Sequence, residues 1–81
     1  MFKARTADGR NNISGLMVKE LRKALQISQR ELSDRLQVVG LDIDKNAVQR
    51  IESGERFVTD IEIIALSKCF NVTVNNLLGI K

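Results

Sequence analysis

The sequence predicts a small all-α domain built from five short helices. Five positions carry a short polar side chain that suits a helix cap, each just ahead of a segment with helical character. The chain has no proline, and its five glycines lie mostly at segment ends. An apolar fraction of 43% excludes a disordered chain, and 81 residues allow one small helical core.

The first residues are expected to form a flexible arm, because residues 1–11 lack periodicity and mix charge with glycine. The helical domain is then expected over residues 12–81. Asn12 is placed to cap its first helix. The apolar side chains of that helix recur at helical spacing, as Leu16 or Met17 followed by Val18, Leu21 and Leu25.

The second and third helices have clear start signals. Ser28 and Glu31 have the spacing of a capping box, in which each side chain bonds a backbone N–H of the other residue. A third helix is expected over about 45–53. Asp44 suits its N-cap, and Gly54 suits its stop.

The last two helices repeat these signals. Thr59 and Glu62 form a second capping-box pattern, which opens a fourth helix that runs to about Phe70. Thr73 then caps a short fifth helix, and Gly79 ends it.

The third helix carries side chains that can read DNA. Val48 and Ile51 lie three residues apart and are expected to face inward. Four polar side chains remain for the outer face: Lys45, Asn46, Gln49 and Arg50. Arginine and lysine suit O6 and N7 of guanine, and asparagine and glutamine suit N6 and N7 of adenine. This pattern is typical of a helix in the major groove; the polar face of an ordinary amphipathic helix is the alternative interpretation.

The chain resembles the lambda repressor and Cro type (XRE-like) of helix-turn-helix protein over about residues 13–79. The resemblance depends on Leu21-Arg22, Ile27-Ser28-Gln29, Glu31-Leu32, Val48, the string from Arg50 to Gly54, Ala65-Leu66 and Asn71-Val72-Thr73. It implies a compact five-helix fold, binding of double-stranded DNA, and commonly a homodimer on a near-palindromic operator.

The resemblance also implies roles for single residues. The four outward side chains of the third helix match the family's base-reading positions. Gln29 matches a residue that contacts phosphate and braces the recognition helix, and Ser53 and Arg56 match further phosphate contacts. Arg22 and Glu52 match a structural ion pair between the first helix and the end of the third.

One departure from the family lies between the second and third helices. Residues 37–44 make this turn about five residues longer than the usual four, and the segment is mostly apolar. We expect the second helix to continue for one turn to Gly40 and the chain then to pack back onto the core. Asp44 complements the helix dipole as a cap, and Asp42 has no role beyond solvation.

The charge and the residue types argue for binding rather than catalysis. The net charge of +3 is uneven, because residues 1–35 contribute +4 and residues 36–81 contribute −1. The chain has no histidine, no Cys or His cluster for a metal, and no phosphate-cradling glycine motif. Cys69 suits a small buried hydrophobe. We therefore expect no enzyme activity, no metal and no cofactor.

The expected compartment is the cytoplasm. The sequence has no apolar run long enough to span a membrane and no signal-peptide core, and a lone cysteine fits a reducing environment.

Two classes of function stay open. The first is a small transcriptional regulator, in particular a repressor. The second is a protein-interaction module of the same fold, such as an antitoxin with a protein partner. Removal of charge and amide groups at Lys45, Asn46 and Arg50 would abolish the first function and leave the second intact.

Two further interpretations concern the ends of the chain. Lys3, Arg5 and Arg10 can form an arm that reaches into a DNA groove, or a solvated tail. Three apolar residues crowd the fifth helix, where they either seal the core or form a dimer interface: Leu77, Leu78 and Ile80.

Overall fold

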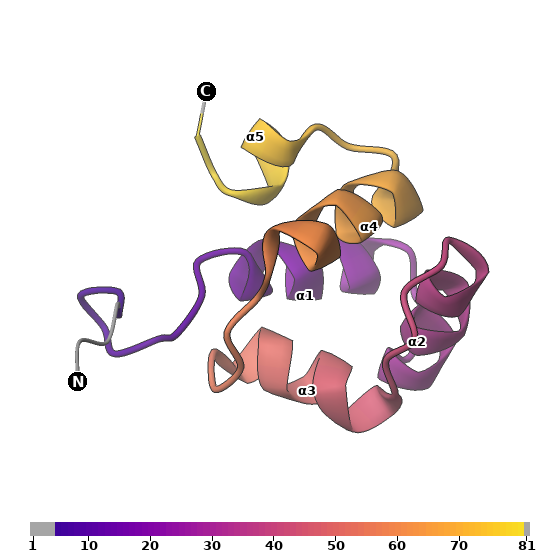
Figure 1. The fold of residues 1–81 in the computed structure, drawn as a ribbon, viewed down its shortest axis with the longest axis horizontal. Coiled ribbons are helices and arrows are strands. Elements are labelled where there is room, and N and C mark those ends of the chain that lie inside the picture. The colour runs from indigo at the N-terminus through magenta and orange to yellow at the C-terminus, as the bar shows by residue number, and fades with distance from the viewer. Residues whose placement is uncertain (1–4, 81) are drawn as a thin grey trace.

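Five helices form the body of the molecule in the computed structural model, which describes residues 5–80. No strand occurs among these residues. The helices are α1 (Gly15–Ala24), α2 (Gln29–Val38), α3 (Lys45–Ser53), α4 (Asp60–Phe70) and α5 (Val74–Leu77). In Figure 1, α1 lies between α4 and α3, α2 closes one side, and the short α5 lies beside α4. The predicted all-α, five-helix fold is confirmed.

One apolar core joins these helices. α3 packs against both α1 and α2, and α4 packs against α2 and α5. The side chains with almost no exposed surface are Val18, Leu32, Leu36, Val48, Ile51, Leu66 and Leu77. Each helix therefore contributes to the core through one apolar face, so that the opposite face of α3 is free to meet a ligand.

The helix starts follow from local side-chain caps. The Ser28 hydroxyl accepts the N–H of Glu31 at 3.0 Å, and Thr73 caps α5 in the same way. At α4 the full capping box forms, because Thr59 accepts the N–H of Glu62 and the Glu62 carboxylate accepts the N–H of Thr59. The box expected at Ser28 forms only in its serine half.

The start and end of α1 differ from the prediction. The N-cap position is Ser14, and Asn12 instead lies buried with its Oδ1 accepting the N–H of Gly15. Leu25 was expected in the apolar stripe, but it is half exposed. α1 ends at Ala24, and Gln26 then turns into the left-handed region at φ 58°.

The long connection between α2 and α3 packs back onto the core as expected, but α2 ends two residues before the predicted Gly40. α2 ends at Val38, and Gly40 then adopts a left-handed conformation with φ 97°, which lets Leu41 donate its N–H back to Leu36 O at 2.9 Å. Leu41 and Ile43 return to the core. The extra residues therefore form a closed turn at the end of α2, and Val38 projects from it with 87% of its surface exposed.

Candidate nucleic-acid interface

α3 presents its polar face to solvent. Lys45, Asn46, Gln49 and Arg50 are all exposed. On the opposite face Val48 and Ile51 are buried in the core. The helix begins at Asp44, whose Oδ1 accepts the N–H of Ala47 at 2.8 Å, and it ends at left-handed Gly54. The structure thus brings the four predicted base-reading side chains together on one exposed face.

An ion pair anchors the C-terminal half of α3 to α1. Arg22 Nε and Nη2 donate to the two carboxylate oxygens of Glu52 at 2.7 and 3.0 Å, and its Nη1 donates to the carbonyl of Ile27 at 2.9 Å. The hydrogen bond to Glu52 raises the pKa of Arg22 further above its ordinary value. Glu52 is only 4% exposed, so the predicted pair is structural and lies inside the molecule.

Gln29 braces the same carboxylate. Its Nε2 donates to Glu52 Oε1 at 3.1 Å, which ties the first turn of α2 to the last turns of α3. This is the bracing role that the resemblance implies. The same residue lines a hollow of about 330 Å³ on the surface between α1, α2 and α3, together with Lys19, Gln49 and Ser53.

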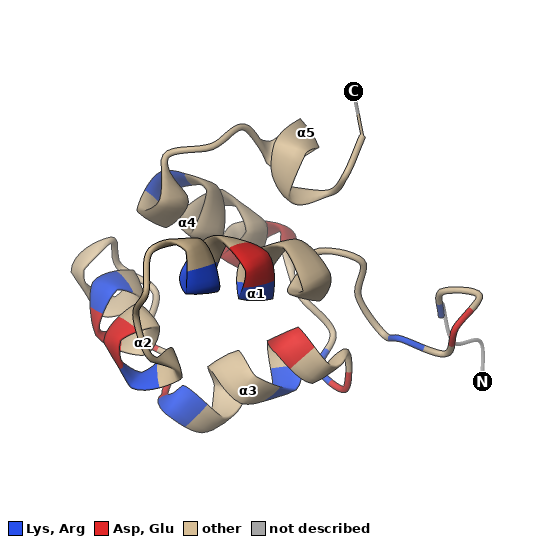
Figure 2. Ribbon diagram, turned by 180° about the vertical axis from the view of Figure 1, so that it is seen from behind, with Lys and Arg blue, Asp and Glu red and all other residues tan. Residues whose placement is uncertain are grey.

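A second hollow lies at the other end of α3. It measures about 290 Å³, and it is lined by Arg30, Ser33, Asp34, Gln37, Asp44 and Lys45. Two cations and two carboxylates therefore meet at the start of α3. Figure 2 shows this mixture, with lysine or arginine along α2 and at the beginning of α3, and acidic residues between them.

The hollows add two basic residues that the sequence analysis missed. Lys19 lines the hollow beside Gln49, and Arg30 lines the hollow beside Lys45. Both side chains are exposed. Lys19 stands three residues before Arg22 on the same side of α1, and Arg30 follows Gln29 in the first turn of α2. The spacing of Lys19 from Arg22 was a signal that could have suggested it, whereas the place of Arg30 depends on how α2 and α3 meet.

The side chains of the two predicted phosphate contacts at and after the end of α3 differ in how tightly they are held. Ser53 is exposed, and its hydroxyl donates to the carbonyl of Arg50 at 3.1 Å. Arg56 is held by the structure, because its Nη2 donates to Glu62 Oε2 at 2.7 Å. Burial alone would raise the pKa of Glu62, but the hydrogen bonds from Arg56 and Thr59 and the charge of Arg56 together outweigh it, and the pKa is lowered.

The last two residues of the expected N-terminal arm, Arg10 and Asn11, bind the C-terminal end of α3. Arg10 donates to the carbonyl of Glu52 at 2.8 Å, and the N–H of Asn11 donates to the carbonyl of Gly54 at 2.8 Å. Arg5 is exposed, and Lys3 lies outside the described residues. Of the three basic residues expected in the arm, Arg10 therefore serves the helical body.

No other kind of site emerges in the described part of the chain. Cys69 is half-buried on α4, and burial raises the pKa of its thiol, which keeps it protonated at neutral pH. Residues 5–80 contain no group of three potential metal ligands. None of their helices combines the length and hydropathy needed to cross a bilayer.

A family model described as helix-turn-helix, HTH_3, matches residues 18–77. The chain belongs to the helix-turn-helix family. The match spans α1 to α5 and includes the α2–α3 unit with its long turn. This helix-turn-helix protein is therefore a sequence-specific DNA-binding transcriptional regulator.

Two solved structures share the fold. The P22 c2 repressor, solved in complex with a synthetic operator, has a TM-score of 0.69 and 24% identity, and the match covers 83% of this chain and 94% of the repressor chain. The restriction-modification controller protein C.AhdI from Aeromonas hydrophila has a TM-score of 0.68 and 26% identity over 79% of this chain and 86% of its own. Among curated protein sequences, none matches this helix-turn-helix protein.

Proposed function

We propose that α3 enters the major groove of a specific operator and that the protein represses transcription by occupying it. One observation carries this proposal: four side chains suited to base edges are exposed together on α3, while the other face of the helix is fixed in the core. Lys45, Asn46, Gln49 and Arg50 are the proposed base contacts. The domain acts by binding, without catalysis or a cofactor.

Phosphate contacts flank the reading helix in this proposal. Gln29 and Ser53 share the hollow at the second turn of α3 with Lys19, and Arg30 lies at the hollow beside its start. Arg56 contributes only if it exchanges its bond to Glu62 for a phosphate. Asp34 and Asp44 line the second hollow beside Arg30 and repel phosphate, so the backbone path is expected to avoid that hollow and Arg30 is not a proposed phosphate contact.

The protein acts as a homodimer in this proposal. Leu77 is fully buried and seals the core, but Ile80 is 55% exposed beyond α5 and is available to a second copy. A dimer would place its half-sites about 34–36 Å apart along one face of the DNA. Sedimentation without DNA at high micromolar concentration tests the dimer, and a monomer there would oppose it.

The proposal is tested by selection of bound sequences from a random-sequence duplex library at near-physiological salt. The wild type and the Asn46→Ala/Arg50→Ala variant are selected in parallel. The control variant is Lys68→Ala/Asn75→Ala, which removes a cation and an amide from exposed positions on α4 and α5. We expect the wild type and the control to enrich one near-palindrome that the α3 variant loses. Each lost base contact should weaken binding by about 1–3 kcal/mol at one base position.

Two results would contradict the proposal. If the folded wild type enriched no sequence, the protein would have no specific operator. Enrichment of the same sequence by the α3 variant would move base reading to another surface. Equal weak binding by all variants would instead favour a protein partner as the main ligand.

A further inference from the structure

The segment before α1 binds the C-terminal end of the recognition helix. We name residues 6–12 the N-terminal strap. Arg10 Nη2 donates to the carbonyl of Glu52 at 2.8 Å and reaches that of Ile51 at 3.5 Å. The backbone of Asn11 donates to the carbonyl of Gly54 at 2.8 Å. The strap thus meets three backbone carbonyls at the α3 terminus, those of Ile51, Glu52 and Gly54, about forty residues away in the sequence.

The bond to Glu52 satisfies a carbonyl at the end of α3, while the carbonyl of Ile51 already accepts the N–H of Gly54. The last carbonyls of an α-helix have no intrahelical donor, and the helix dipole favours a cation beside them. Arg10 supplies both the donor and the positive charge. Because hydrogen bonds from a charged group are stronger than neutral ones, this contact holds the last turn of α3 more firmly than a neutral cap would.

A second strap residue fixes α3 against α1. The Asn12 Nδ2 donates to the carbonyls of Ile51 and Arg56 at 3.1 and 2.7 Å, and its Oδ1 accepts the N–H of Gly15 at 2.8 Å. One buried amide therefore joins the end of α3, the segment after it and the start of α1.

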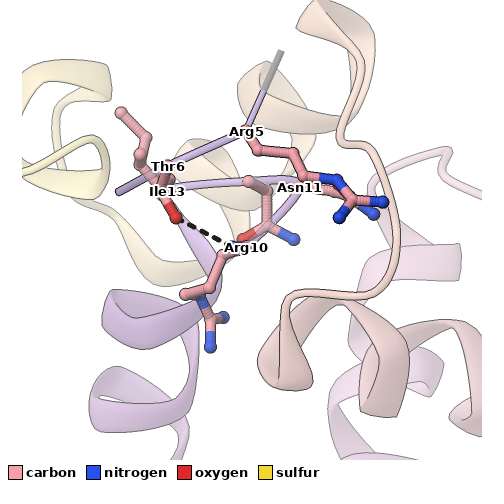
Figure 3. A pocket seen from close by; sticks show the side chains of 6 residues that line it. Arg5, Thr6, Arg10, Asn11 and Ile13 are labelled. Atoms are coloured by element: carbon pink, nitrogen blue, oxygen red, sulfur yellow. Dashed lines mark hydrogen bonds between the residues drawn. The ribbon is translucent and has the colours of Figure 1, made fainter. Parts of the chain in front are cut away.

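The seat of the Arg10 side chain is shaped for it. A β-carbon at Gly54 would lie 2.8 Å from Arg10 Cζ, so the guanidinium packs directly on a position where only glycine fits. Gly54 also has φ 87°, which disfavours any other residue. The strap itself is folded around Arg10, whose N–H donates to the Thr6 hydroxyl at 2.9 Å, as the dashed line in Figure 3 shows.

We propose that Arg10 is a positioning residue for DNA reading. It fixes the last turn of α3, and with it the direction of Gln49 and Arg50, which immediately precede the capped carbonyls. This inference rests on the proposed function, since it assumes that α3 reads the operator. It differs from the arm interpretation, in which Arg10 would itself contact DNA.

The test compares Arg10→Ala and Arg10→Lys with the wild type. Arg35→Ala is the matched control, because it removes the same charge from an exposed position on α2. Arg35 lies close enough to Cys69 of α4 for its charge to act on that thiol. Three quantities are measured: the ratio of operator to random-duplex affinity, the dependence of operator affinity on salt, and amide hydrogen exchange of residues 51–56 in the free protein.

For Arg10→Ala we expect the affinity ratio to fall by about tenfold, which is the usual worth of a hydrogen bond to a charged group. The salt dependence should stay at its wild-type slope, and amides 51–56 should exchange faster. Arg10→Lys should recover part of the ratio, because lysine keeps the charge and can donate from its ammonium group but lacks the planar geometry of the guanidinium. The control should match the wild type in all three measurements.

Three outcomes would overturn the proposal. A slope reduced by about 0.9 with an unchanged ratio would make Arg10 a phosphate contact. An unchanged ratio with a lower unfolding temperature would make it a purely structural cap. If the wild-type protein selected no operator, both the proposed function and the positioning role would be wrong. Faster amide exchange in Arg10→Ala would even then show that the strap holds α3.

Discussion

The two ends of the recognition helix are held in very different ways. The N-terminal end follows a turn with an exposed valine, and its N-cap bond comes from Asp44. At the C-terminal end, Glu52 accepts from Arg22 and Gln29, and the strap bonds the terminal carbonyls. The difference indicates that the C-terminal end of α3 sets the direction of the helix. The connection before it can therefore vary in length while the reading face keeps its place.

The largest expected effect is at the clamped end. Glu52→Gln leaves the Arg22 guanidinium inside the molecule without its counter-charge, and we expect a loss of about 3–5 kcal/mol in the free energy of unfolding. Urea denaturation followed by circular dichroism measures it. Arg22→Met/Glu52→Met is the control, since an apolar pair should recover much of this loss. A loss under about 1 kcal/mol for Glu52→Gln would show that the pair is not the anchor.

The second prediction compares two glycines, Gly15, which contacts the C-terminal end of α3, and Gly40, which lies in the turn before its N-terminal end. A β-carbon at Gly15 would overlap the carbonyl oxygen of Ile51, so Gly15→Ala should destabilise by about 3 kcal/mol through displacement of α1 from α3. At Gly40 nothing lies within 4 Å of such a carbon, but φ is 97°. Gly40→Ala should therefore cost only about 1–2 kcal/mol. Thermal unfolding of both variants ranks them, and the reverse order would contradict the comparison.

The smallest effect is expected at the start of α3. Asp44→Ala removes the bond to the N–H of Ala47 and should destabilise by about 1 kcal/mol. Asp44→Ser is the control, because serine also caps helices well, without the charge. Operator selection should be unchanged if the C-terminal clamp sets the helix direction. A new consensus sequence for Asp44→Ala would show that both ends set it.

The sequence predicted most of the fold because most helix signals are local. The starts of α2, α3, α4 and α5 each depend on a side chain that bonds a backbone N–H three residues later, which is readable from spacing alone. At α1 the local bond could also be read, because Asn12 accepts the N–H of Gly15 three residues later, but the bonds of Asn12 to the end of α3 could not. Asn12 is bound to the distant end of α3, and no local pattern records that contact.

The candidate site divides along the same line. The outward face of α3 follows from helical periodicity, so its four polar residues could be selected from the sequence. The hollows that add Lys19 and Arg30 depend on how three helices meet, which spacing within one helix does not determine. The attachment of Arg10 likewise depends on tertiary packing, and residue type alone suggested either a groove-binding arm or a solvated tail.

The strap has a consequence for truncated versions of this protein. The family match begins at residue 18, and α1 begins at Gly15. A fragment trimmed to either boundary would keep all or most of the helical body and every proposed base-reading side chain. It would lack Arg10 and Asn12, so the carbonyls that they bind at the end of α3 would turn to water. We therefore expect the functional boundary of the domain to lie upstream of its first helix.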